Sequence, residues 1–255
     1  MVLDSFVRAL DGFEAALAGV APGRWDAPSP CEGWSAADVA GHVIGDLQAV
    51  KGFATWRDED NGIADPRCAA GDDPVAEWRA ERARMMAALD PAALARPVPL
   101  PWGGQMPLGE WLERYPMEFL VHTWDLAQAT GQAVVLDPGL VHEALGPARQ
   151  FAPIARMSGL IGPECAVADD ADDLTRLLAI FGRRNLRRLK PPQRLPPQQP
   201  HLAGQFRIGK PVDGAQGAAH LLIETAGRDV HVLSLDLEPI AAAGPGPVRG
   251  GPQQR

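Results

Sequence analysis

The sequence predicts a mainly helical protein with a short β appendage near its C-terminal end. Apolar residues recur at helical spacing in most segments up to residue 182, whereas alternating stretches appear after residue 202. A run rich in proline and glutamine, residues 191–200, separates the two patterns. The 255 residues suffice for one domain of ordinary size with a small addition.

The composition is that of a folded protein and excludes several functional classes. Hydrophobic residues make up 46% of the chain and charged residues 22%. The net charge of -8 argues against a nucleic-acid partner, because phosphate neutralisation needs a basic surface. Residues 183–190 are basic, and we interpret them as a solvated helix end. We expect no membrane span and no signal peptide, since long apolar runs and a basic leader are missing.

The cysteines favour a reducing, cytoplasmic compartment. Their number is odd and they lie far apart, so a disulfide framework is not expected. No pair has the Cys-x-x-Cys spacing of a thiolate zinc site. Cys31 precedes a predicted helix, and we interpret it as a small buried side chain rather than a reactive thiol. The oligomeric state is left open by the sequence.

Six helices are expected before the proline-rich run. They cover residues 3–19, 35–55, 74–89, 108–130, 138–157 and 170–182. Ser35 begins the second helix, and Asp38 completes a capping box three residues later. Pro116 lies inside the fourth helix, where it must kink the helix or remove a hydrogen bond. Gly131 is a suitable C-terminal cap for the same helix.

The remaining segments predict loops and strands. We interpret residues 57–73 as a loop, and the prolines and glycines at 97–104 as an irregular crossing or a short hairpin. Strand-like pieces follow at residues 205–208, 220–225 and 230–237. A two-residue turn between the last two would place Glu224 opposite His231. The expected organisation is a helical domain (1–186), a linker (187–202), a β hairpin or strand appendage (203–238) and a disordered tail (239–255).

Two histidines on strongly apolar predicted helices suggest a metal site. Glu118 precedes His122 by four residues, so both side chains project from one face of the fourth helix. A buried imidazole beside a buried carboxylate is costly unless something pairs them, and a metal ion does so. His42, on the second helix, can complete the set. On spacing alone, an ordinary ion pair on the helix surface remains the alternative.

Two histidines and one carboxylate form a catalytic rather than a structural ligand set, because coordination positions stay open. Zinc is the metal that we expect, although iron, manganese and nickel accept the same ligands. Other residues are expected to line the pocket or to orient the ligands: Trp34, Asp46, Trp124 and Asp125. Packing is the alternative for Trp34, Trp124 and Asp125, and in the functional interpretation Asp125 orients a ligand or a helix terminus. We interpret Asp46 as a solvated helix acid rather than a fourth ligand.

Two stretches resemble the signatures of one family. Residues 29–45, SPCEGWSAADVAGHVIG, are similar to the start of the second helix in the mycothiol-dependent maleylpyruvate isomerases, a family of the DinB-like superfamily. Residues 118–131, EFLVHTWDLAQATG, are similar to the second signature of that family, and residues 156–183 resemble the end of its domain. The resemblance therefore covers about residues 1–186.

The resemblance implies an up-and-down four-helix bundle with a metal at one end, built from the first, second and fourth helices and either the third or the fifth. It maps the metal ligands onto His42, Glu118 and His122. It further implies an isomerase or thiol transferase in which the metal activates a low-molecular-weight thiol, such as mycothiol, for addition to an electrophilic small molecule. The alternatives are a thiol-independent metalloenzyme of a specialised biosynthetic pathway and a non-catalytic metal-binding protein.

The sequence departs from the family pattern in two respects. Pro116 lies just before Glu118, where the family continues a regular helix. The family also carries a second, sterol-carrier-protein-like domain with an arginine on the substrate side, whereas about fifty residues follow the linker here. The sequence therefore assigns neither that arginine nor the substrate.

Overall fold

The computed structural model confirms the mainly helical fold. It describes residues 3–55, 66–99, 104–157 and 159–184, together with the backbone of three strands further along the chain. The helices are α1 (Asp4–Ala18), α2 (Ala36–Thr55), α3 (Pro66–Ala70), α4 (Pro74–Ala88), α5 (Pro91–Leu94), α6 (Leu108–Arg114), α7 (Pro116–Thr130), α8 (Pro138–Met157) and α9 (Asp173–Ile180).

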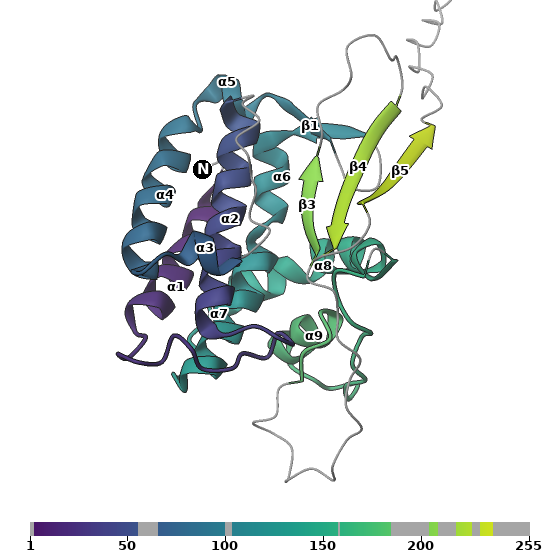
Figure 1. Cartoon of the computed structure of the whole chain (residues 1–255). Coiled ribbons are helices and arrows are strands. Elements are labelled where there is room, and N and C mark those ends of the chain that lie inside the picture. Colours follow the sequence, from purple (N-terminus) through teal and green to yellow (C-terminus); the bar gives the residue numbers. More distant parts are fainter. Residues whose placement is uncertain are drawn as a thin grey trace, which may run out of the picture.

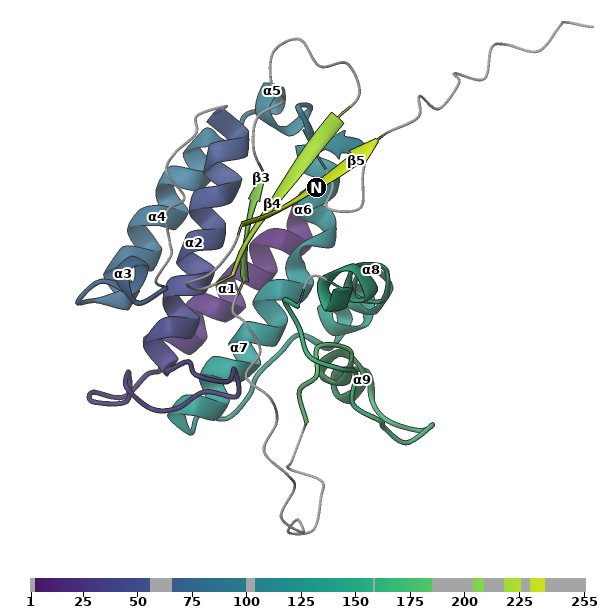
Figure 2. The same cartoon turned by 45° about the vertical axis from the view of Figure 1, so that its right-hand side comes forward.

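Four of these helices form the bundle. Helix α1 packs on α4 and α7, and α2 packs on the same two helices (Figure 1). The third predicted helix, now α4, therefore completes the bundle, whereas the fifth, now α8, packs on α7 and α9. Two views place α8 and α9 beyond α7, across the bundle from α4 (Figures 1 and 2). The largest side chains of the core are fully buried: Phe6, Phe13, Trp78 and Phe119.

The start of α2 has the capping box that the sequence predicts. The backbone N–H of Ser35 donates to the Asp38 carboxylate at 2.7 Å, and the backbone N–H of Asp38 donates to the Ser35 hydroxyl at 3.3 Å. Helix α7 ends at Gly131, which has a φ of 77°, a conformation that glycine adopts without strain. Local backbone chemistry thus fixes the start of α2, which carries His42, and the end of α7, which carries Glu118 and His122.

The proline predicted to disturb the fourth helix divides it into α6 and α7. Tyr115 ends α6 and precedes α7, so Pro116 occupies the first position of α7, where no intrahelical N–H bond is lost. Aromatic rings span the junction: Tyr115 lies 4.5 Å from Trp111 and 5.6 Å from Phe119 between ring centroids. The division places Glu118 in the first turn of α7.

Two short helices were missed by sequence reasoning. Helix α3 lies inside the segment predicted as a loop, and α5 follows α4 directly. The signal for α5 was present, because Asp90 accepts a hydrogen bond from the Ala93 N–H at 2.7 Å and Pro91 follows it. The short hairpin expected near residue 100 is confirmed: β1 (Pro97–Pro99) pairs antiparallel with β2 (Gln105–Pro107).

The C-terminal strands are β3 (Gly204–Ile208), β4 (Ala218–Thr225) and β5 (Val230–Asp236), which form an antiparallel sheet in that order. The predicted pairing of Glu224 with His231 is wrong, because the register is shifted by one residue and places Glu224 opposite Val230. The linker, the turn at 226–229 and the tail lie outside the described residues, so the domain boundaries stay predictions. In the part of the chain that the structure describes, each helix is too short or too polar to cross a bilayer.

Candidate metal centre

Helices α2 and α7 bring His42, Glu118 and His122 to one point. The Oε1 atom of Glu118 lies 3.1 Å from Nε2 of His42 and 2.9 Å from Nε2 of His122. The two imidazole rings are 4.7 Å apart and nearly perpendicular. One donor atom from each residue lies within 4.8 Å of the other two. Two histidines from different helices thus share a single carboxylate oxygen of Glu118.

The spacing of the donor atoms fits a tetrahedral divalent ion. Two ligand atoms at about 2.1 Å from zinc in tetrahedral geometry are separated by about 3.4 Å. The observed separations from Glu118 Oε1, 3.1 and 2.9 Å, are shorter by about half an ångström or less. A small outward shift of the side chains would therefore seat the ion. His42, Glu118 and His122 would hold it, and the remaining coordination positions would be open to a small molecule.

Electrostatics make this cluster ready to accept a cation. Burial alone would raise the pKa of Glu118, but His122 and His42 hold it well below its ordinary value. Burial alone would lower the pKa of His122, but Glu118 raises it well above its ordinary value. Glu118 and His122 therefore each favour the charged form of the other, so that a proton on the imidazole would balance the Glu118 charge without metal. A divalent ion at the same place would displace that proton.

Trp34 lies beside both imidazoles. Its ring centroid is 5.0 Å from that of His42 and 6.3 Å from that of His122, with the second pair nearly parallel. The loop before α2 fixes this position, because the Ser29 N–H donates to the Trp34 carbonyl at 2.8 Å. Gly33, with φ of 78°, provides the reversal that this loop needs. Trp34 therefore lies against the rings of both histidines of the cluster.

Asp46 is not the solvated acid that we expected. Its side chain is only 16% exposed, and its Oδ2 atom lies 3.7 Å from Nε2 of His42. Within the described part of the chain, this oxygen has no hydrogen-bond partner. A buried oxygen without a donor beside the cluster is further evidence that the site suits a cation or a polar ligand.

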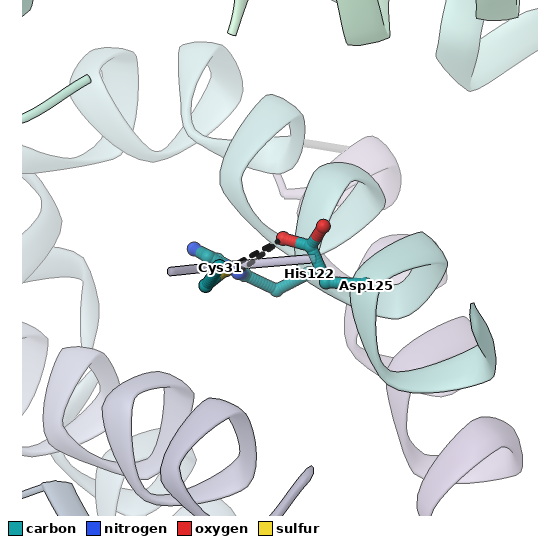
Figure 3. Close-up of side chains that lie close together, drawn as sticks. All are labelled: Cys31, His122 and Asp125. Atoms are coloured by element: carbon teal, nitrogen blue, oxygen red, sulfur yellow. Dashed lines mark hydrogen bonds and ion pairs between the residues drawn. The ribbon is translucent and has the colours of Figure 1, made fainter. Parts of the chain in front are cut away.

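A second network surrounds the other side of His122 (Figure 3). Oδ2 of Asp125 lies 3.0 Å from Nδ1 of His122, although the two atoms are not aligned for a hydrogen bond. Arg183 donates to both Asp125 oxygens, at 3.3 and 3.0 Å, and to the sulfur of Cys31 at 3.1 Å. The Cys31 thiol in turn donates to Asp125 at 3.2 Å. Asp125 therefore lies next to Nδ1 of His122, and its role in orienting that residue stays a prediction.

Two interpretations of the sequence are corrected by this network. Arg183 is not part of a solvated helix end, because its side chain is only 15% exposed and paired with Asp125. Cys31 is more than a small packing residue, since its sulfur both donates and accepts a hydrogen bond. No pattern in the sequence pointed to Arg183, because it is the first residue of a basic run whose partner lies on a distant helix.

Cys31, His122 and Asp125 are also close enough to form a metal-binding group by themselves. The guanidinium of Arg183 already supplies the positive charge there, however, because it bonds both Asp125 and Cys31. A metal ion would have to displace a buried, charged side chain. Of the two groups, the one with His42 and Glu118 is therefore the better cation site.

Trp124 does not belong to the site. It is buried, with 4% of its surface exposed. It follows His122 by two residues, so the helix directs the two side chains to different faces. Its position is consistent with packing alone.

Comparison with known proteins identifies the family. The model of the mycothiol maleylpyruvate isomerase N-terminal domain matches residues 6–127, which include all three residues of the cluster. The chain belongs to this family. Two Mycobacterium tuberculosis relatives, the uncharacterized proteins MT0763 and Rv0738, are each 34% identical over 160 residues, which cover 62% of this chain and 78% of the relative. The family predicted from the two signatures is thus confirmed.

Two solved structures are also similar. One is the crystal structure of a mycothiol-dependent maleylpyruvate isomerase, with a TM-score of 0.47, 18% identity, and coverage of 60% of this chain and 69% of the other. The second is that of a histidine-to-alanine variant of such an enzyme, with a TM-score of 0.46, 17% identity and the same coverage. These likenesses are too low to carry a functional argument.

Proposed function

We propose that the chain is a metal-dependent enzyme that activates a low-molecular-weight thiol of the mycothiol type for reaction with an electrophilic small molecule. The observation that carries the proposal is the convergence of His42, Glu118 and His122 on one point. The family supports the thiol, because its description names mycothiol and maleylpyruvate. Isomerisation of the electrophile and transfer of sulfur to it are the two reactions that we propose.

A divalent ion at this site would lower the pKa of a bound thiol and so supply a thiolate nucleophile. We prefer zinc, while iron, manganese and nickel suit the same ligands. The protein's own contribution is positional. Glu118 holds both imidazoles through one oxygen, and Trp34 covers their rings. The free Oδ2 of Asp46 is placed to accept a hydrogen bond from a group that enters beside His42.

A cytoplasmic location and the two small-molecule partners, a thiol and an electrophile, are part of the same proposal. Among the described residues Cys31, Cys68 and Cys165 form no disulfide, which supports a reducing compartment. The thiol-independent metalloenzyme and the non-catalytic metal-binding protein are the outcomes that would replace the proposal.

The test begins with metal binding. His122→Ala should weaken zinc binding by more than about 100-fold, because loss of a direct ligand exceeds the roughly 10–100-fold effect of losing an outer partner. His142→Ala is the matched control: this histidine is 76% exposed and pairs with Asp173, far from the cluster in sequence and on another helix. Equal zinc affinity in the wild-type protein and in His122→Ala would reject the site.

Activity separates the remaining alternatives. The purified protein is assayed on electrophilic alkenes in four conditions, with and without the metal and with and without a low-molecular-weight thiol. Turnover that needs both supports the proposal. Full turnover with metal but without thiol would favour the thiol-independent enzyme. Tight metal binding without turnover of any acceptor would favour the non-catalytic protein.

A further inference from the structure

The buried Arg183 and its partners form a network that the proposed function does not use. We propose that Arg183 is a positioning residue for the metal centre, which holds the Asp125 carboxylate against the imidazole of His122. The inference rests on the proposed function, because it takes His122 as a metal ligand. In this proposal Arg183, which lies beyond the end of α9, sets the orientation of the ligand His122 on α7.

The geometry places Arg183 behind the ligand rather than in the ligand set. Its Nε and Nη2 atoms donate to Oδ1 and Oδ2 of Asp125, which is a bidentate arrangement. Its Nη1 atom donates to the carbonyl of Phe181 at 2.8 Å, which fixes the guanidinium to its own backbone. All three guanidinium nitrogens therefore have partners, and the side chain cannot rotate without breaking several bonds.

The held carboxylate faces the ring nitrogen that is not directed at Glu118. Nε2 of His122 points toward Glu118, and Nδ1 lies 3.0 Å from Asp125. An acid at this place favours the tautomer with its proton on Nδ1, which leaves the lone pair of Nε2 for a metal. Cys31 contributes a further contact, because its thiol donates to the same Asp125 oxygen. Two residues, Asp125 and His122, thus lie between Arg183 and the proposed metal.

Charge explains why arginine is needed here. Asp125 is fully buried, and a buried carboxylate without a cation is strongly disfavoured. If Arg183 were lost, Asp125 would move toward solvent or take His122 as its only counter-ion. In either case the carboxylate that faces Nδ1 is no longer held in place, so the imidazole is free to rotate away from the position that a metal needs. Both weaken metal binding.

The experiment measures the zinc affinity of the full chain by competition with a chromogenic chelator. Arg183→Gln should weaken zinc binding about 10–100-fold, and Asp125→Asn should do the same. Arg183→Lys should lose less, because one ammonium can still pair with Asp125 but cannot bond both oxygens in the fixed arginine geometry. Arg184→Gln is the matched control, since Arg184 is the next residue and is exposed; its affinity should stay within about two-fold of wild type.

Two further readouts separate positioning from a merely structural role. Circular dichroism of each metal-free variant reports whether the bundle is folded, and the visible spectrum of the Co²⁺-loaded protein reports the coordination geometry. A changed Co²⁺ spectrum in a folded Arg183→Gln or Arg183→Lys protein supports the proposal. Wild-type zinc affinity and an unchanged spectrum in folded Arg183→Gln would overturn it. Failure of the wild-type protein to bind metal would instead overturn the proposed function.

Discussion

Replacing Asp46 by asparagine should stabilise the metal-free protein while it impairs the site. The Oδ2 atom of Asp46 is buried and has no hydrogen-bond partner among the described residues. Burial raises its pKa from the ordinary 3.8 to about 6, against the opposing effect of His42. Asparagine keeps the shape of the side chain but has no charge to bury. The substitution therefore isolates the cost of the charge.

The magnitude follows from the difference between the two pKa values. Each pKa unit corresponds to about 1.4 kcal/mol, so the ionised carboxylate costs the folded state about 3 kcal/mol near pH 7. Because the pKa of this acid is raised on folding, the folded state binds more protons than the unfolded state between about pH 4 and pH 6. The cost is thus absent below pH 4 and complete above pH 6–7.

The measurement is urea unfolding of Asp46→Asn and wild-type protein in a chelator, followed by tryptophan fluorescence. Near pH 7.5 the variant should be more stable by up to about 3 kcal/mol, and at about pH 4 the two proteins should be equal. Asp170→Asn, at an exposed position, serves as the control and should change little. Equal stability at both pH values, or a gain that does not depend on pH, would refute the reasoning.

Two further substitutions test the scaffold. Glu14→Gln should remove part of the acid sensitivity, because Arg82 and Arg79 outweigh burial and lower the pKa of Glu14 below its ordinary 4.5. In the wild-type protein Glu14 contributes to the free energy of unfolding above about pH 4.5. This contribution is lost as the pH falls through the lowered pKa that Glu14 has in the folded state. Urea unfolding at several pH values would detect the loss. Pro116→Ala should reduce the free energy of unfolding by about 0.4–1 kcal/mol, because proline restricts the unfolded chain, with zinc affinity retained. A large loss of affinity would show that Pro116 itself, rather than aromatic packing, positions Glu118.

The features that the sequence determined are those set by nearby residues. The capping box at Ser35, the end of α7 at Gly131 and the break at Pro116 all depend on local backbone chemistry. The i, i+4 spacing of Glu118 and His122 is likewise a property of a single helix. Spacing alone did not assign His42 to the site. The similarity of residues 29–45 to a family signature supported that assignment. These residues could therefore be proposed as a site from the sequence alone.

Tertiary packing alone decided the features that depend on distant partners. The basic run at 183–190 has a solvent-exposed pattern, yet packing buries Arg183 against Asp125 and Cys31. Asp46 has the pattern of a solvated helix acid, yet in the assembled bundle its side chain is only 16% exposed and its Oδ2 atom has no hydrogen-bond partner among the described residues. The energy of a charged side chain depends on which charges and how much water surround it, and only the assembled bundle fixes both.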